Sequence, residues 1–145
     1  MITLFEDCAT EMFKSVEEIR YIVFFQEQHA QGEALLDEYD ALDTTRFALS
    51  VDPESRMPYA AGRIIQYKDG VKIGRIAVLP EKRGTGEGKK LVEFLCRSAE
   101  DKGIKKIYVD AQLHAVPFYD KLGFKPTGEE TIFDIGIEHL PMVKE

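Results

Sequence analysis

The stretch that decides the fold is residues 76–89, which read Ile-Ala-Val-Leu-Pro-Glu-Lys-Arg-Gly-Thr-Gly-Glu-Gly-Lys. Its apolar first part predicts the end of a strand, which Pro80 terminates. Glycine-rich residues 83–88 then lead into a helix whose inner face carries Leu91, Leu95 and Ala99. Backbone N–H groups at a helix start point toward an anion, and glycines let the backbone approach it closely. The stretch therefore predicts a phosphate-binding loop between a strand and a helix.

Two common nucleotide-binding motifs do not fit this loop. A Walker A motif needs four residues between its glycines and a hydroxyl after the lysine, whereas three residues separate Gly84 from Gly88 and Lys90 stands at the hydroxyl position. The dinucleotide fingerprint would need its third glycine at Lys89. The spacing that fits is Arg/Gln-x-x-Gly-x-Gly/Ala, with Arg83, Gly86 and Gly88 at the defined positions.

The segments before the loop predict a hairpin. Apolar runs at residues 59–67 and 71–79 are separated by Lys68-Asp69-Gly70, and Asp-Gly supplies the positive φ that a tight hairpin requires. The two runs should therefore be antiparallel neighbours. Further strands are expected at residues 2–5 and 45–51.

An amphipathic helix is expected near the N-terminus. It begins at Thr10, or as late as Ser15 if Ser15 and Glu18 form a capping box, and the apolar residues at helical spacing are Met12, Val16, Ile19 and Val23. The polar segment 26–43 should be a loop with one helical turn at residues 34–36.

The segments after the long helix predict a parallel crossover. Gly103 is a suitable residue to follow the helix, and residues 104–110 form the next strand. A short helix at 115–122, strands at Phe124 and 132–135, and an edge strand at 140–143 complete the chain. The expected fold class is α/β (α+β), a single domain over residues 1–145 with a mixed, mostly antiparallel central sheet flanked by helices.

Composition narrows the class of function. The chain has 145 residues, and its 26 acidic and 19 basic side chains give a net charge of −7. This balance argues against nucleic acid as a partner, and the longest apolar stretch, residues 21–25, is too short to cross a bilayer. The two cysteines, Cys8 and Cys96, favour a reducing cytoplasm, and no spacing indicates a metal site.

The loop resembles the acetyl-CoA pyrophosphate loop of the GNAT N-acetyltransferase superfamily. Residues 110–124 are similar to the second cofactor segment of that family, with its A-x-x-F-Y-x-K-x-G-F core intact from Ala115 to Phe124. Residues 23–28, 37–40, 62–63 and 136–139 resemble a small bacterial single-domain subgroup. Arg46 departs from the histidine expected in that subgroup, which leaves any substrate role of this position open.

The resemblance implies a GNAT acyl-CoA N-acyltransferase fold and transfer of the acetyl group of acetyl-CoA to a primary amine in a ternary complex. The amine would belong to a small molecule, a peptide N-terminus or a lysine. Tyr119 would be the general acid that protonates the thiolate. The implied cofactor-binding residues are Ile76, Ala77 and Val78 on the strand, Arg83, Gly84, Thr85, Gly86, Glu87, Gly88 and Lys89 in the loop, and Gln112 and Phe118 beside the pantetheine arm.

The acceptor side stays open at the level of sequence. Candidate general bases are Asp37, Glu38, Asp110 and His114, and candidate substrate-binding residues are Glu38, Asp40, Asp110 and His114. The acidic segment 37–43 either attracts a protonated amine or is a solvated loop. His139 is expected to be structural or to line the substrate site. A monomer and a homodimer are both reasonable, and the alternative function is a non-catalytic acyl-CoA-binding or sensing protein on the same fold.

Overall fold

The computed structural model describes all residues from 1 to 145. Its centre is an eight-stranded sheet in the order β1-β2-β3-β4-β5-β8-β6, with β7 paired to β8. The β4–β5 pair is parallel and all other pairs are antiparallel, which confirms the mixed, mostly antiparallel sheet. The strands are β1 (Ile2–Phe5), β2 (Arg46–Val51), β3 (Pro58–Tyr67), β4 (Gly70–Val78), β5 (Ile107–Gln112), β6 (Lys125–Pro126), β7 (Ile132–Asp134) and β8 (Ile137–Lys144).

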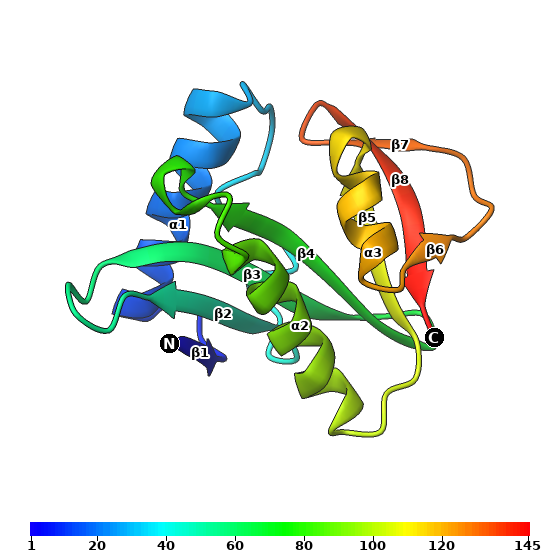
Figure 1. The fold of residues 1–145 in the computed structure, drawn as a ribbon, viewed down its shortest axis with the longest axis horizontal. Helices are drawn as coiled ribbons and strands as arrows, with labels where there is room; N and C mark the ends of the chain where they lie inside the picture. The colour runs from blue at the N-terminus through cyan, green and yellow to red at the C-terminus, as the bar shows by residue number, and fades with distance from the viewer.

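Helices cover both faces of the sheet. They are α1 (Glu11–Arg20), the π-helix η1 (Tyr21–Glu27), the 3-10 turns η2 (Pro80–Lys82) and η3 (Leu113–Ala115), α2 (Glu87–Glu100) and α3 (Val116–Lys121). Successive residues of a strand point to opposite faces. Accordingly, Phe47 of β2 packs in the cluster of α1, whereas Ala48 packs in the cluster of α2. In Figure 1, α2 lies in front of the strands and the lower part of α1 lies behind them.

The N-terminal helix differs from its sequence prediction in two ways. It begins at Glu11, with Thr10 as its N-cap, so the capping box at Ser15 is wrong. Phe13, not Met12, occupies the buried position, because the buried stripe continues through Val16 and Arg20 at spacings of three and four residues. The helix also runs on as η1 to Glu27, and no helical turn forms at residues 34–36.

The β3–β4 hairpin forms as expected but for a different local reason. The positive φ falls on Lys68, at 47°, and not on Gly70. Gly70 is required by a close approach instead, because a Cβ there would lie 2.0 Å from the carbonyl oxygen of Lys106. That carbonyl accepts a hydrogen bond from the N–H of Val71, so the start of β5 is held tightly against the start of β4.

The last strand was expected at an edge, and this prediction is wrong. β8 lies inside the sheet, between β5 and β6, and it also carries β7. It pairs with β5 over six positions, from Ile107 with Lys144 to Gln112 with His139. The apolar run 140–143 gives no signal for this position, because the register depends on a strand thirty residues earlier. The pairing places His139 opposite Gln112, at the end of β5.

Candidate active site

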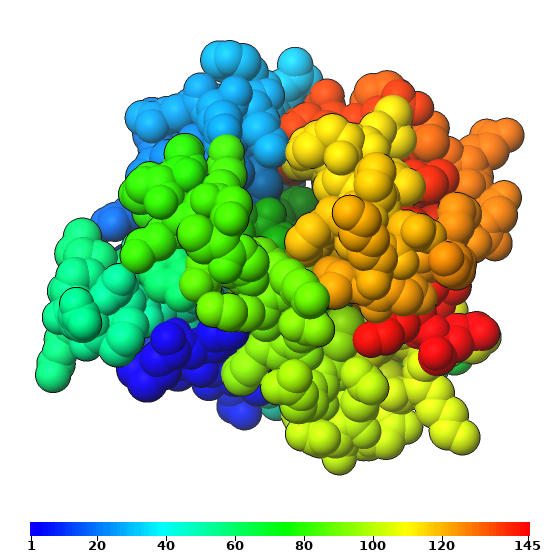
Figure 2. Space-filling model, viewed as in Figure 1, coloured from blue at the N-terminus to red at the C-terminus, as the bar shows by residue number.

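A cleft opens where β4 and β5 separate. The two strands pair only from Val71–Ile107 to Ile73–Val109 and diverge beyond that point. Just after the separation begins, Arg75 has a φ of 50° and the register of β4 against β3 shifts, which indicates a bulge. The resulting cavity of about 920 Å³ is lined by residues of η1, β4, the glycine loop, α2, β5, α3 and β8. In Figure 2 a hollow lies between the yellow segment around α3 and the blue and green segments, with β4 at its bottom.

The glycine loop presents unpartnered backbone donors to one end of this cavity. The backbone N–H groups of residues 84–89 have no hydrogen-bond acceptor in the protein. Gly84 and Gly86 have φ values of 80° and 83°, and a Cβ at either position would meet no atom within 4 Å. Gly86 is the N-cap of α2, so the positive end of the helix dipole adds to the donors. Six free N–H groups around open space suit an anion.

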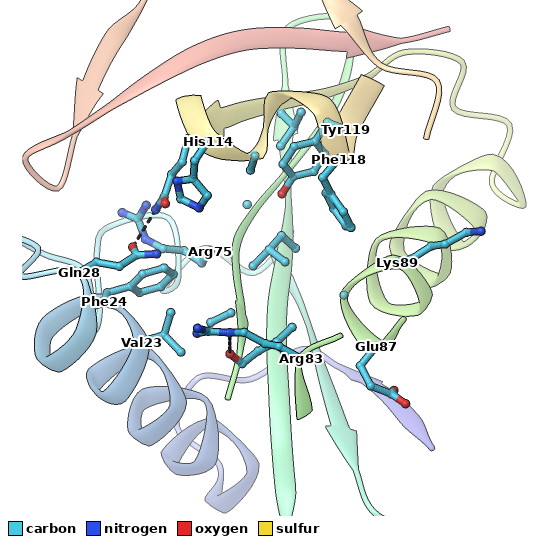
Figure 3. A pocket seen from close by; sticks show the side chains of 18 of the residues that line it. Val23, Phe24, Gln28, Arg75, Arg83, Glu87, Lys89, His114, Phe118 and Tyr119 are labelled. Atoms are coloured by element: carbon cyan, nitrogen blue, oxygen red, sulfur yellow. Dashed lines mark hydrogen bonds between the residues drawn. The ribbon is translucent and has the colours of Figure 1, made fainter. Parts of the chain in front are cut away.

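The side chains of the loop contribute less to that site than its backbone. Figure 3 shows the side chains of Glu87 and Lys89 pointing away from the centre of the cavity. Glu87 accepts a hydrogen bond of 2.8 Å from the Tyr59 hydroxyl. Burial, together with this bond, raises the pKa of Tyr59 to about 12. Thr85 is exposed and donates to the carbonyl of Lys82, and it does not line the cavity.

Arg83 crosses the mouth of the cleft. Its two terminal nitrogens bind the carboxylate of Glu27, each at 2.5 Å, and its Nε donates to the carbonyl of Val78 at 3.0 Å. The bond from Arg83 holds the pKa of Glu27 below its ordinary value. The guanidinium therefore links the end of η1 to the edge of β4, and its charge is balanced within the protein.

The edge of β4 offers backbone groups to the cleft. The N–H of Leu79 binds the carbonyl of Tyr59 on β3. Hydrogen-bonded and non-hydrogen-bonded positions alternate along an antiparallel pair, so the N–H and C=O of Val78 point away from β3. The C=O accepts from Arg83 Nε, and the N–H is left facing the gap. Ile76 and Val78 line the same cavity. An extended chain of amides entering the cleft could add to this edge as a further strand.

Tyr119 projects from α3 into the cavity. Its ring packs against Phe118 and Phe124 at centroid distances of 5.0 and 5.6 Å. Burial raises the pKa of its phenol well above the ordinary value. The hydroxyl has no hydrogen-bond partner in the protein, but it is not fully buried. The fully buried side-chain nitrogen and oxygen atoms without a partner are Arg20 Nε and Arg75 Nε. Figure 3 shows that the hydroxyl points into the cavity.

Polar side chains on β5 and β8 form the wall opposite η1. Gln112 donates a hydrogen bond of 2.9 Å to Gln28 of the η1 C-cap, which joins the two sides of the cleft. Asp110 lines the cavity but is paired with Lys72 at 2.7 Å. His139 stands directly opposite Gln112 in the β5–β8 register, so both side chains lie on one face of the sheet. His114 is exposed at the rim.

Two of the four carboxylates in the acidic segment 37–43, those of Asp37 and Asp40, are held in ion pairs with arginines. The Asp40 side chain is fully buried and binds Arg20 at 2.9 Å and Arg63 at 3.0 Å. Asp37 binds Arg63 at 2.5 Å and Arg75 at 3.1 Å, and Arg75 also binds Asp134 at 2.6 Å. Asp37 and Asp40 are therefore not free to attract an amine, whereas Glu38 and Asp43 of the same segment face solvent.

This cluster corrects the expected substrate side of the site. Neither Asp40 nor Glu38 lines the cavity: Asp40 is 1% exposed, and Glu38 faces solvent. Asp40 therefore has a structural role. Two cavity-lining residues were not expected from the sequence: Glu27, which pairs with Arg83, and Arg75, which pairs with Asp37 and Asp134. Glu27 follows Val23 by four residues, which puts both side chains on the same face of a helix. This spacing is the one signal in the sequence that could have placed Glu27 on the face that lines the cavity.

No group of three or more His, Cys, Asp or Glu side chains is arranged to hold a metal ion. None of the helices has the length and apolar character needed to span a bilayer.

Comparisons with known proteins identify the family. The family model described as "Acetyltransferase (GNAT) domain" matches residues 14–145. The chain therefore belongs to the GNAT acetyltransferase family. It is 35% identical over 136 residues to the uncharacterized N-acetyltransferase YjcF of Bacillus subtilis, covering 93% of this chain and 94% of that protein.

Solved structures show the same fold. An acyl-CoA N-acyltransferase from Pseudomonas aeruginosa superposes with a TM-score of 0.86 at 22% identity, covering 100% of this chain and 99% of the other. An aminoglycoside 6'-N-acetyltransferase complexed with coenzyme A superposes with a TM-score of 0.72 at 16% identity, covering 99% and 96%. Structures of this fold thus include a coenzyme A complex, and these neighbours confirm the expected GNAT fold.

Proposed function

We propose that this protein transfers the acetyl group of acetyl-CoA to a primary amine, with Tyr119 as the general acid. The observation that carries the proposal is the run of free backbone N–H groups at residues 84–89, of which all but Thr85 line the same cavity as the unpartnered Tyr119 hydroxyl. The donors suit a pyrophosphate, since they need no metal and no side-chain charge to bind an anion. The β4 edge at Val78 suits the amides of a pantetheine arm.

The chain's own residues have separate roles in this reaction. The N–H of Val78 polarises the thioester carbonyl and stabilises the oxyanion that forms there. Burial keeps the Tyr119 phenol protonated, so that it can donate its proton to the departing sulfur. Phe118 packs against the Tyr119 ring and fixes its direction. The bond between Gln112 and Gln28 holds the two walls of the acceptor side together.

The acceptor side favours an amine on a largely apolar body over a polycation. Val23, Phe24 and Ile135 contribute apolar surface there. The carboxylates that line this part of the cavity are already paired: Glu27 with Arg83 and Asp110 with Lys72. No free negative charge is left to hold a second ammonium group, which a polyamine or an aminoglycoside would bring.

The test is release of coenzyme A from acetyl-CoA, followed with a thiol reagent, in the presence of different amines. The panel is 2-phenylethylamine, spermidine, kanamycin and a lysine-containing peptide. We expect turnover with at least one amine, fastest with 2-phenylethylamine. Calorimetric binding of acetyl-CoA without turnover of any amine would instead support a non-catalytic acyl-CoA-binding protein.

A tyrosine variant tests the acid. Tyr119→Phe should lower kcat by roughly 10²- to 10⁴-fold while the Kd of acetyl-CoA stays within about twofold, because only the proton donor is lost. Tyr21→Phe is the matched control, since Tyr21 is 47% exposed and does not line the cavity. Full turnover by Tyr119→Phe would remove Tyr119 from the mechanism.

A further inference from the structure

The proposed reaction needs a group that takes a proton from the attacking amine, and most candidates in the cavity are engaged. Glu27 is held by Arg83, and Asp110 is held by Lys72. Glu87 accepts from Tyr59, and its side chain points away from the centre of the cavity (Figure 3). Of the carboxylates and imidazoles lining the cavity, the two histidines, His114 and His139, remain outside any ion pair.

The two histidines differ in how firmly they are held. His114 is exposed and has no hydrogen bond that would select one ring nitrogen. His139 is 6% exposed, and its Nδ1 lies 2.7 Å from the carbonyl oxygen of Ile137. A carbonyl oxygen can only accept, so Nδ1 carries the proton in this contact and Nε2 of the neutral ring is left with a lone pair.

The free nitrogen of His139 also has access to the cavity. Nε2 has no hydrogen-bond partner in the protein. It is nevertheless not fully buried, because the fully buried atoms without a partner are Arg20 Nε and Arg75 Nε. Gln112, directly opposite in the register, points into the same cavity and reaches Gln28. Nε2 is thus a buried, oriented acceptor on the wall where the amine is expected.

We propose that His139 is the general base of the acetyl transfer, with Nε2 as the proton acceptor and the Ile137 carbonyl fixing its tautomer. This rests on the proposed acetyltransferase function. The neutral amine attacks the thioester carbonyl, so that the N–C bond forms and one N–H proton passes to Nε2. The C–S bond then breaks, and the sulfur takes the proton of Tyr119. The imidazolium returns its proton to the tyrosinate through water, which restores both residues.

Charged groups around His139 complete the site. Asp134 of β7 lies close enough to His139 for the two side chains to interact electrostatically. The carboxylate of Asp134 is bound by Arg75 of the β4 bulge. From β5, the facing side chain is the neutral amide of Gln112. Because Asp134 is bound by Arg75, no unpaired carboxylate from β7 or β5 lies beside the histidine.

The first test needs no acceptor. In protein labelled with ¹⁵N-histidine, long-range ¹H–¹⁵N correlation spectra should show neutral His139 with a protonated Nδ1 and an unprotonated Nε2. The chain has three histidines, so the signals lost in His29→Asn and in His114→Asn assign the other two rings and leave the third set for His139. A ring protonated on Nε2 would overturn the proposal, because that nitrogen could not then accept a proton.

The second test is kinetic and uses whichever amine of the panel above is turned over. His139→Asn keeps a side-chain N–H near the Ile137 carbonyl and removes Nε2. We expect kcat to fall by roughly 10²- to 10⁴-fold, the acid limb of the kcat profile against pH to disappear, and the Kd of acetyl-CoA to change by less than about twofold. His29→Asn is the matched control: His29 is exposed, lies outside the cavity and has a φ of 56°, which asparagine accepts.

The outcomes separate the two proposals. Wild-type kcat and pH profile in His139→Asn would overturn the role of His139 and leave the acetyltransferase proposal standing. Absence of turnover in the unmodified protein would overturn the acetyltransferase proposal itself. If His139→Asn fails to fold, the tautomer measured in the unmodified protein decides.

Discussion

Replacing Asp40 by asparagine should destabilise the protein strongly, because its carboxylate forms ion pairs with two buried guanidinium groups. The oxygens of Asp40 accept from Arg20 at 2.9 and 3.1 Å, from Arg63 at 3.0 Å and from the N–H of Asp37 at 2.9 Å. The side chains of Arg20 and Arg63 are 0% and 7% exposed. An amide of the same shape removes the charge and turns an N–H group toward these donors.

The size of the effect follows from this burial. Removing one partner of a buried ion pair costs about 3–5 kcal/mol, since the remaining charge cannot be solvated. For a chain of 145 residues this corresponds to a fall in Tm of roughly 6–20 °C.

Urea and thermal unfolding followed by circular dichroism measure the change. The matched control is Asp43→Asn, on the same loop, where the side chain is exposed and makes no ion pair; its free energy of unfolding should stay within about 0.5 kcal/mol of the wild type. A loss below about 1 kcal/mol in Asp40→Asn would refute the reasoning.

The same cluster sets the response to acid. Burial alone would raise the pKa of Asp37, but its bond to Arg63 and the charges of Arg63 and Arg75 outweigh burial and lower it. A carboxyl whose pKa is lower in the folded state stabilises the protein above its unfolded pKa of about 4, and this contribution is lost as the pH falls through the folded value. The Tm should therefore decline steadily below about pH 4, and a Tm independent of pH in that range would contradict this account.

Three further predictions concern the cavity and the thiols. Gly86→Asp should raise the Kd of coenzyme A at least roughly 100-fold in a calorimetric titration, because two like charges about 4 Å apart near a protein surface repel by about 4 kcal/mol. The matched control is Gly103→Asp, which has a nearly equal φ of 81° but lies beyond the other end of α2 and should bind coenzyme A normally. Because burial raises the pKa of Tyr119, kcat should not fall on the alkaline side up to about pH 10, and a decline between pH 8 and 10 would argue against the buried phenol as the acid. Burial raises the pKa of Cys96 to about 11, so in native protein a thiol reagent should modify at most Cys8, and reaction of both thiols without denaturant would contradict this packing.

The parts of the fold that the sequence predicted are those specified by neighbouring residues. The hairpin, the glycine loop, α2 and the short helix before Gly123 each depend on turn chemistry or helical spacing within about fifteen residues. Even there, the structural reason can differ. The hairpin places its positive φ on Lys68, and Gly70 is glycine because of a carbonyl 36 residues later.

The parts that could not be predicted depend on contacts between distant segments. The charges of Asp37 and Asp40 are visible in the sequence, but nothing local indicates that Arg20, Arg63 and Arg75 meet them. A pattern of charge alone fits a solvated loop equally well. The pairing of these groups decides that Asp37 and Asp40 stabilise the fold and are not free to attract a cation.

By itself, the sequence determined the glycine loop between a strand and a helix and the position of Tyr119 on a short helix, because both are local and carry a recognisable spacing. Only the tertiary structure decided what surrounds them. The divergence of β4 from β5 opens the cavity, and the register of β8 brings His139 opposite Gln112. The physical reason is that hydrogen-bond register and charge neutralisation join residues far apart in the chain, so the acceptor side of the site exists only once the sheet has closed around it.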